Sequence, residues 1–476
     1  MKRRSFLKSI TAGSMAASLA TSARGQDQPE TASRPPNVLL ILADDLSAKE
    51  LSCHGNDTIH TPRIDALGRS GVQFRTAWSA PLCGPSRAQM QTGKYAYQTG
   101  YFDNTIRPKT PFYRSHLTLG AAMKQRGYRT AMYGKIHHGG DPREYGFDEY
   151  CAARYWEGYD GPNQALGPPT RGMYAIQWYW HPGLVHNGQG IPTTPDQFGP
   201  DIEARMIREF MTAHREDPFF IYWPTNLIHM EHFAPNGWRY ADVPEMDEHG
   251  RPTGRKVKGS TKSTTEYLDH LVGTLVDHLE GLGLRENTVV FFVGDNGTAE
   301  YGKNRLESEK AIHVPFVVNG PGLVESLGPR DELVDLTDVL PTLADLAGKP
   351  LPAEGGFDGH SFAPLLRGEP FVPREWIFAQ LNEARWLRDT RWLLDGNGSF
   401  HDCGSSRGEW LGYGDVTRSV DAEVIAARKR FEAILHKLPP PDYDDPETAE
   451  AWKRHFATVG RHKPYRPPYL DANAPE

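Results

Sequence analysis

Five mostly apolar runs recur along the chain, and each has the length of a β-strand. They lie at residues 37–43, 130–133, 219–223, 288–293 and 315–318. Side chains of an extended segment alternate between two faces, so a run without polar alternation is typical of a strand covered on both faces. The pattern therefore predicts a buried sheet that contains these five segments.

Apolar side chains recur at helical spacing between these runs. The clearest stripe consists of Leu268, Leu271, Val272, Leu275 and Leu279. Residues 201–214 predict a second helix, and residues 119–123 predict a third that ends at Gly127. Strands that alternate with helices predict an α/β fold, with helices flanking a large, mostly parallel central sheet.

The pattern changes after about residue 370. Residues 376–381 and 385–394 are typical of strands in a small antiparallel sheet, and residues 422–436 are typical of a helix. The end of the chain is rich in proline and charge and is expected to run over the surface. We therefore predict a large domain over residues 37–370 and a C-terminal subdomain with its tail over residues 371–476.

The first 25 residues have the features of an export signal. Lys2-Arg3-Arg4-Ser5-Phe6-Leu7-Lys8 resembles the twin-arginine signal, and the apolar run that follows is too short to span a bilayer. Residues 26–36 are polar and contain proline, so we expect a disordered leader. We expect twin-arginine export machinery to deliver a protein without a membrane span to the periplasm or the exterior.

The composition and net charge indicate a globular protein and argue against a protein that binds nucleic acid. The chain has 476 residues, of which 38% are hydrophobic and 24% charged, as in a globular protein. Its net charge of −7 gives no basic footprint for nucleic acid. The four cysteines, Cys53, Cys83, Cys151 and Cys403, lack metal-finger spacing, and the sequence leaves their pairing open.

Polar residues follow four of the predicted strands directly. These residues are Asp44 and Asp45 after the first run, Lys135 and His137 after the second, His229 after the third, and Asp295 and Asn296 after the fourth. Ligands of open α/β sheets bind beyond the carboxyl ends of the strands. We therefore expect these side chains to converge on one site.

Four of these residues have the chemistry of a metal site. Asp44, Asp45, Asp295 and Asn296 offer oxygen ligands, which Ca²⁺ and Mg²⁺ prefer, and no histidine or cysteine stands beside them in the sequence to favour zinc. A cation would also offset the cost of burying adjacent carboxylates. The alternative for the Asp44-Asp45 pair is a solvated turn or a helix cap.

A compact motif surrounds Cys83. Cys83-Gly84-Pro85-Ser86-Arg87, followed by Thr92-Gly93-Lys94, resembles the signature of the type I sulfatases, members of the alkaline-phosphatase-like superfamily. The resemblance implies that a formylglycine-generating or sulfatase-maturating enzyme converts Cys83 to Cα-formylglycine. It also implies bound Ca²⁺, with an oxygen of residue 83 completing the ligand shell. The alternative is that Cys83 is a small buried apolar residue.

The resemblance assigns roles to the neighbouring residues. It implies that Arg87, Lys135 and His137 hold and activate the nucleophile and that His229 and Lys303 bind sulfate, with His137 or His229 transferring protons. Pro85 suits the first turn of a helix, which would place residue 83 at an anion-binding helix N-terminus.

Two parts of the pattern depart from the family. The family more often has proline before the histidine that corresponds to His229. The segment from Lys303 to Pro315 is one residue longer than usual, and His313 replaces an arginine. Alternatives therefore stay open, namely Arg305 or Lys310 for the sulfate contact and His138 or His232 as rival histidines.

The implied reaction is hydrolysis of a sulfuric ester to release inorganic sulfate. An aldehyde hydrate carries two hydroxyls, so one can attack sulfur and the other can then lose its proton and expel sulfate, which splits one hard step into two. A serine would instead leave a stable sulfate ester. A phosphonate or phosphate ester hydrolase of the same superfamily and an inactive sulfoglycan-binding homologue are the alternatives.

The substrate is not fixed by the motif. Residues 150–190 are rich in aromatic side chains, namely Tyr155, Trp156, Tyr159, Tyr174, Trp178, Tyr179 and Trp180, with His181 beside them. They are either ordinary core or a surface that stacks on sugar rings. Together with export, they favour a sulfated carbohydrate over an aryl sulfate or another sulfated small molecule.

Overall fold

The computed structural model describes residues 34–104, 108–153, 178–233, 237–406, 413–442 and 450. The chain divides into two compact units, Met1–Arg34 and Pro35–Glu476, and all the described helices and strands belong to the second. The predicted export signal, residues 26–33 of the leader, Tyr155, Trp156, Tyr159, Tyr174 and most of the tail lie outside the described residues.

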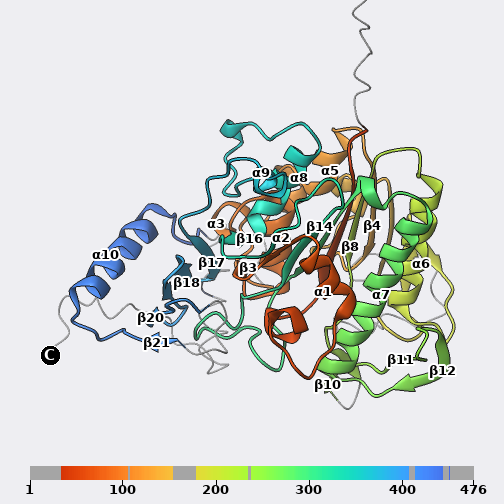
Figure 1. Ribbon diagram of the computed structural model, residues 1–476, viewed down its shortest axis with the longest axis horizontal. Helices are drawn as coiled ribbons and strands as arrows, with labels where there is room; N and C mark the ends of the chain where they lie inside the picture. The colour runs from red at the N-terminus through yellow and green to blue at the C-terminus, as the bar shows by residue number, and fades with distance from the viewer. Residues whose placement is uncertain are drawn as a thin grey trace, which may run out of the picture. The chain divides into compact units, whose positions relative to one another are not determined.

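A sheet of ten strands among the described residues forms the centre of this unit (Figure 1). The strand order is β15-β2-β14-β13-β1-β8-β4-β5-β6-β7. Its five central strands are parallel to one another, namely β13 (Thr288–Gly294), β1 (Asn37–Ala43), β8 (Phe219–Pro224), β4 (Arg129–Gly134) and β5 (Glu149–Ala153). The predicted α/β fold with a mostly parallel sheet is therefore confirmed.

Further strands extend the sheet at both edges through antiparallel pairings. On one side β14 (Phe316–Asn319) pairs antiparallel with β13 and with β2 (Val72–Phe74), and β15 (Gly328–Arg330) pairs parallel with β2. On the other side β6 (Leu184–His186) and β7 (Gln189–Ile191) form a hairpin beside β5.

Helices cover both faces of the sheet, which explains why β1 is apolar throughout. Leu39 and Ile41 pack in the core beneath one group of helices, whereas Leu40 and Leu42 pack beneath the other. The first group comprises α1 (Pro62–Arg69), α6 (Gly199–Ala213) and α7 (Thr261–Gly281). The second comprises α2 (Cys83–Thr92), α5 (Leu119–Lys124), α8 (Val339–Leu346) and α9 (Ala363–Leu366).

A separate antiparallel sheet follows near the C-terminus, as predicted. Its strands are β17 (Ile377–Leu381), β18 (Ala384–Arg388), β19 (Trp392–Leu394), β20 (Phe400–Asp402) and β21 (Gly414–Asp415). Helix α10 (Ala422–Lys437) packs against it through Val424, Ala427 and Phe431 (Figure 1). The domain boundary at residue 370 stays a prediction.

Buried polar contacts join this small sheet to the segment that precedes β14. The Arg388 guanidinium donates to the Glu309 carboxylate at 2.7 Å, and both side chains are fully buried. The adjacent Ser308 donates its backbone N–H to Asp395 at 2.8 Å and accepts a hydrogen bond from the Trp386 indole at 2.8 Å. The C-terminal sheet therefore holds the segment that also carries Lys303.

Smaller features complete the fold. Helix α5 ends at Lys124, earlier than predicted, and Gly127, with φ of +86°, allows the turn into β4. All four cysteines lie in the described ranges and are free thiols. Within those ranges, every helix is too short or too polar to cross a lipid bilayer.

Candidate active site

Residue 83 opens helix α2 at the end of the central sheet. Leu82 is extended and occupies the N-cap position, so residue 83 lies at the positive end of the helix dipole, which favours anions. The Cys83 side chain is 1% exposed. Its Sγ lies 3.4 Å from Asp44 Oδ1 and 3.7 Å from Asp45 Oδ1. Burial raises the pKa of the Cys83 thiol, so the unmodified side chain is a poor nucleophile.

Three carboxylates meet where β1 and β13 end. The parallel register pairs Ala43 with Gly294, which brings Asp44 and Asp45 alongside Asp295. Asp45 has φ of +59°, a left-handed conformation unusual for a residue other than glycine, and its backbone N–H donates to Asp295 Oδ1 at 2.9 Å. The two strand ends are thus tied to each other.

Three cationic side chains compensate these carboxylates. Lys135 Nζ lies 2.5 Å from Asp44 Oδ2, and Lys303 Nζ lies 2.7 Å from Asp45 Oδ1. Two N–H groups of Arg87 donate to Asp295 Oδ2 at 3.0 and 2.7 Å. These pairs are buried or nearly so, so the loss of one partner would leave an uncompensated charge.

The environment separates the pKa values of two of these acids. Burial alone would raise the pKa of Asp44, but Lys135, His229 and Arg87 together hold it well below its usual range. Burial and the charge of Asp44 raise the pKa of Asp295 to about 7, although Arg87 opposes the shift.

The donor set fits a hard divalent cation. Asn296 Nδ2 donates to Asp45 Oδ1 at 2.8 Å, whereas Asn296 Oδ1 is buried and has no hydrogen-bond partner. A buried amide oxygen without a partner is rare in proteins, and a cation would satisfy it. One ligand atom from each of Asp44, Asp45, Cys83 and His229 lies within 4.8 Å of the others.

One histidine joins this cluster, although none stands beside the acids in the sequence. His229, which the sequence predicts at the same strand-end site, has its Nε2 3.5 Å from Asp45 Oδ2. The chain reversal after β8 delivers this histidine from a distance of 184 residues, which adjacency in the sequence cannot indicate. The mainly oxygen-bearing set still favours Ca²⁺ or Mg²⁺ over zinc.

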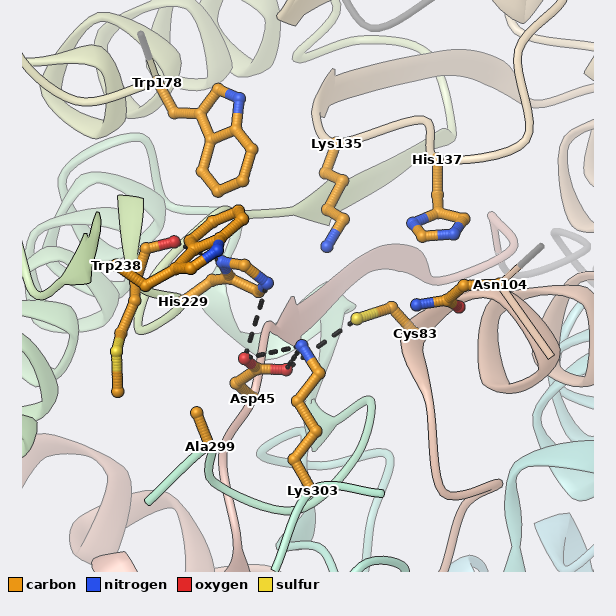
Figure 2. Close-up of a pocket in the computed structure, with 11 residues that line it drawn as sticks. Asp45, Cys83, Asn104, Lys135, His137, Trp178, His229, Trp238, Ala299 and Lys303 are labelled. Carbon is orange, nitrogen blue, oxygen red and sulfur yellow. Dashed lines mark hydrogen bonds and ion pairs between the residues drawn. The ribbon is translucent and has the colours of Figure 1, made fainter. Parts of the chain in front are cut away.

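The two predicted histidines both line the pocket (Figure 2). Burial lowers the pKa of His229 to about 4, and burial together with the Lys135 charge lowers the pKa of His137 well below its usual range. Both rings are therefore neutral near pH 7. The rival His138 instead packs between Tyr101 and Phe112 at 4.6 and 4.9 Å between ring centroids. The side chain of His232 lies outside the described part.

Among the three candidate cations of the long segment, Lys303 points into the site (Figure 2). Arg305 is 56% exposed and pairs with Glu307 at 3.2 Å. Lys310 Nζ lies 5.7 Å from the centre of the Tyr301 ring. The fold thus brings Lys303 to Asp45 and leaves the two alternatives away from the pocket lining.

A pocket of about 270 Å³ opens onto residue 83 (Figure 2). Its lining includes four residues that the sequence did not indicate, namely Asn104, Met230, Trp238 and Ala299. They stand in loops or at the ends of short strands, where no periodicity marks them. Asn104 accepts a hydrogen bond from the backbone N–H of Gly84 at 2.8 Å and so supports the start of α2.

The large, mostly parallel sheet and the site at its strand ends are typical of the alkaline-phosphatase-like α/β fold. The sequence profile of the Sulfatase family matches residues 36–349. Arylsulfatase A of Homo sapiens is 31% identical over 384 residues, which span 72% of this chain and 70% of that protein. Steryl-sulfatase of Mus musculus is 28% identical over 453 residues, which span 76% and 69%.

A solved structure agrees with these relatives. Ps i-CgsB in complex with k-i-k-neocarrahexaose has a TM-score of 0.68 and 24% sequence identity, and the match covers 88% of this chain and 97% of that chain. The chain belongs to the sulfatase family. It is therefore an enzyme that hydrolyses sulfate esters.

Proposed function

We propose that this sulfatase acts through formylglycine at position 83 and a bound Ca²⁺ to release inorganic sulfate from a sulfated carbohydrate. The observation that carries the proposal is the position of Cys83. It stands at the N-terminus of α2, within 3.7 Å of both Asp44 and Asp45, in a pocket that also contains Lys135 and Lys303.

The proposed groups would be held by residues of this chain. Asp44, Asp45, Asp295 and Asn296 would hold Ca²⁺, or Mg²⁺ in its place, together with an oxygen of residue 83. The cation would supply positive charge to the sulfuryl oxygens, and the formylglycine hydrate would supply one hydroxyl to bond to sulfur and a second whose deprotonation expels sulfate.

The charge balance of the pocket supports an anionic ester. Asp44, Asp45 and Asp295 are matched by Arg87, Lys135 and Lys303. A divalent cation would make the cluster net positive, which favours the binding of a sulfate ester and opposes its loss before hydrolysis. Lys303 would bind the sulfate oxygens beside the positive end of the α2 dipole.

The neutral histidines are suited to move protons. His229, whose imidazole lies beside Asp45, would contact sulfate, accept the proton of the attacking hydroxyl and pass that proton to the leaving alcohol. His137, which faces Gly84 at the start of α2, would hold the second hydroxyl and accept its proton. Arg87 would keep Asp295 ionised and in place.

The setting of the reaction is also proposed. We infer export by the twin-arginine machinery to the periplasm or the exterior, after a maturation enzyme has modified Cys83. A sulfated sugar is supported by Ps i-CgsB, which was solved with a carrahexaose and shares the fold. An exported enzyme would encounter such polymers outside the cell.

Peptide mass spectrometry combined with a sulfate-release assay tests the proposal. The tryptic peptide of residues 76–87 is expected to be about 18 Da lighter than its thiol form and to react with a hydrazide probe. The peptide of residues 144–154, which contains Cys151, is the control and should remain a thiol. Sulfate release by protein whose Cys83 is entirely thiol would overturn the proposal, as would faster release of phosphate or phosphonate than of sulfate.

Lys303 and Lys310 offer a matched pair of variants. Lys303→Ala is expected to lower kcat/KM by about a hundredfold, because it removes one charged contact to sulfate in the transition state. Lys310→Ala is expected to retain activity, because that ammonium lies over Tyr301. The measurement is steady-state kinetics on one sulfate ester, with thermal unfolding of both variants. A large loss in Lys310→Ala with little change in Lys303→Ala would reverse the assignment.

A further inference from the structure

The pocket has two chemically different walls (Figure 2). One wall is aromatic and apolar and consists of Trp178, Trp238 and Met230. The facing wall is polar and includes Lys135, His137 and Asn104. The reacting position, residue 83, belongs to the polar wall, so a group bound to sulfate would extend between the two.

The two indoles of the aromatic wall pack against the His229 ring. The His229 ring lies 5.0 Å from the Trp178 ring and 5.6 Å from the Trp238 ring, measured between centroids, and the two indoles are 6.4 Å apart. The buried carboxylate of Glu231, in β9 (Glu231–Phe233), accepts the backbone N–H of Trp178. Strand β9 pairs with β10 (Gly237–Arg239), which carries Trp238.

The two tryptophans differ in exposure. Trp178 is 2% exposed, as a structural side chain would be, whereas Trp238 is 39% exposed although it lines the pocket. An indole that lines the pocket and keeps 39% of its surface exposed can stack on a ligand, because burying that surface removes apolar area from water.

We propose that Trp238, supported by Trp178 and Met230, binds the apolar face of the pyranose ring that carries the sulfate ester. This inference rests on the proposed function and adds to it the residue that selects the sugar. A pyranose has one face of C–H groups and a rim of hydroxyls, and the two walls match these two features. The Asn104 amide, on the polar wall, would bind a ring hydroxyl.

The polar wall argues against a purely apolar leaving group. An aryl or steroid ring would stack on Trp238 but would place its other face against Lys135, His137 and Asn104, and it would offer their remaining polar atoms no hydrogen-bond partner in place of water. A sugar hydroxyl replaces that water. The geometry therefore points to a carbohydrate sulfate as the preferred substrate class.

This inference is tested by kinetic measurements that distinguish binding of the sugar ring from binding of the sulfate group. The probes are a panel of galactose and glucosamine monosulfates, 4-nitrophenyl sulfate, and inorganic sulfate as product inhibitor. For the best sugar sulfate, Trp238→Ala is expected to raise KM by about tenfold with kcat within about twofold, and Trp238→Phe is expected to be intermediate. The inhibition constant of inorganic sulfate should not change, because sulfate alone does not reach the indole.

Trp180→Ala is the matched control. The Trp180 ring packs against Phe198 at 5.0 Å and beneath Lys256 Nζ at 3.3 Å, and it is not among the pocket-lining residues. Its KM for the same sugar should stay within about twofold of the wild-type value. An equal rise of KM in both variants would mean a general disturbance of the fold and would overturn the inference.

Other results would also overturn it. A parallel rise in the inhibition constant of sulfate, or a fall in kcat at constant KM, would mean that Trp238 acts only by positioning His229. A higher kcat/KM for 4-nitrophenyl sulfate than for every sugar would exclude the pyranose preference.

Binding measured in a protein that cannot turn over its substrate distinguishes a failure of this inference from a failure of the proposed function. Calorimetric titration of the Cys83→Ala protein with the same sugar sulfates should give an affinity that falls about tenfold when Trp238→Ala is added. Tight sugar binding by a wild-type protein that releases no sulfate would refute the proposed function and leave the Trp238 contact standing. No binding of any sugar sulfate to either protein would refute the contact itself.

Discussion

Replacing Cys83 by alanine is expected to lower sulfate release by at least about 10⁴-fold, the scale of losing a covalent nucleophile. The fold should survive, because the change removes one atom from a side chain at the first position of α2 and alanine suits that position. We expect the free energy of unfolding to change by no more than about 1–2 kcal/mol. The measurements are sulfate release under saturating substrate and denaturant unfolding of the same preparations.

Cys151→Ala is the matched control for this experiment. Cys151 is a fully buried thiol in β5, remote from the pocket lining, and its truncation should cost stability but leave turnover intact. Cys83→Ser should also be inactive, unless the host modifies serine. Substantial turnover by Cys83→Ala would refute the nucleophile assignment.

Removing divalent cations is expected to produce the second large effect. Dialysis against a chelator should lower activity by at least about a hundredfold, because a bound cation supplies several kcal/mol of transition-state stabilisation. Added Ca²⁺ should restore the activity. It should also raise the Tm of the wild-type protein, since a ligand that binds only the folded state adds about 2.7 kcal/mol of stability at a concentration one hundred times its Kd.

A pair of aspartate variants ties this effect to the predicted ligands. Asp45→Asn should abolish both the Ca²⁺-dependent rise in Tm and the activity. Asp277→Asn should retain the Ca²⁺ response and the activity, because the Asp277 side chain is 55% exposed and pairs with Arg63 at the surface. Full activity in the presence of the chelator, or an unchanged Ca²⁺ response in Asp45→Asn, would contradict the metal assignment.

The sequence predicts where the site lies, because apolar runs that form parallel strands end at the same edge of one sheet. Residues 37–43 and 288–293 had to lie in one sheet interior, so Asp44, Asp45, Asp295 and Asn296 had to meet at its edge. The five predicted strands are present within one residue of the expected bounds, and the predicted apolar stripe from Leu268 to Leu279 lies on α7.

Other features depend on backbone conformation that no side-chain pattern encodes. The positive φ of Asp45 arises in a loop, and Trp238 stands in a short hairpin without periodicity. Whether Lys303, Arg305 or Lys310 approaches the acids depends on the path of an irregular segment. That path is fixed by contacts with residues about 80 positions later in the chain.

These contacts have a consequence for the order in which the enzyme is completed. Until β18 has been synthesised, the Glu309 carboxylate has no guanidinium to compensate its burial, and an unpaired buried charge costs about 3–5 kcal/mol. The segment from Lys303 to His313 therefore cannot settle before Trp386 and Arg388 are in place. Synthesis and pairing of β18 are thus a precondition for a competent pocket.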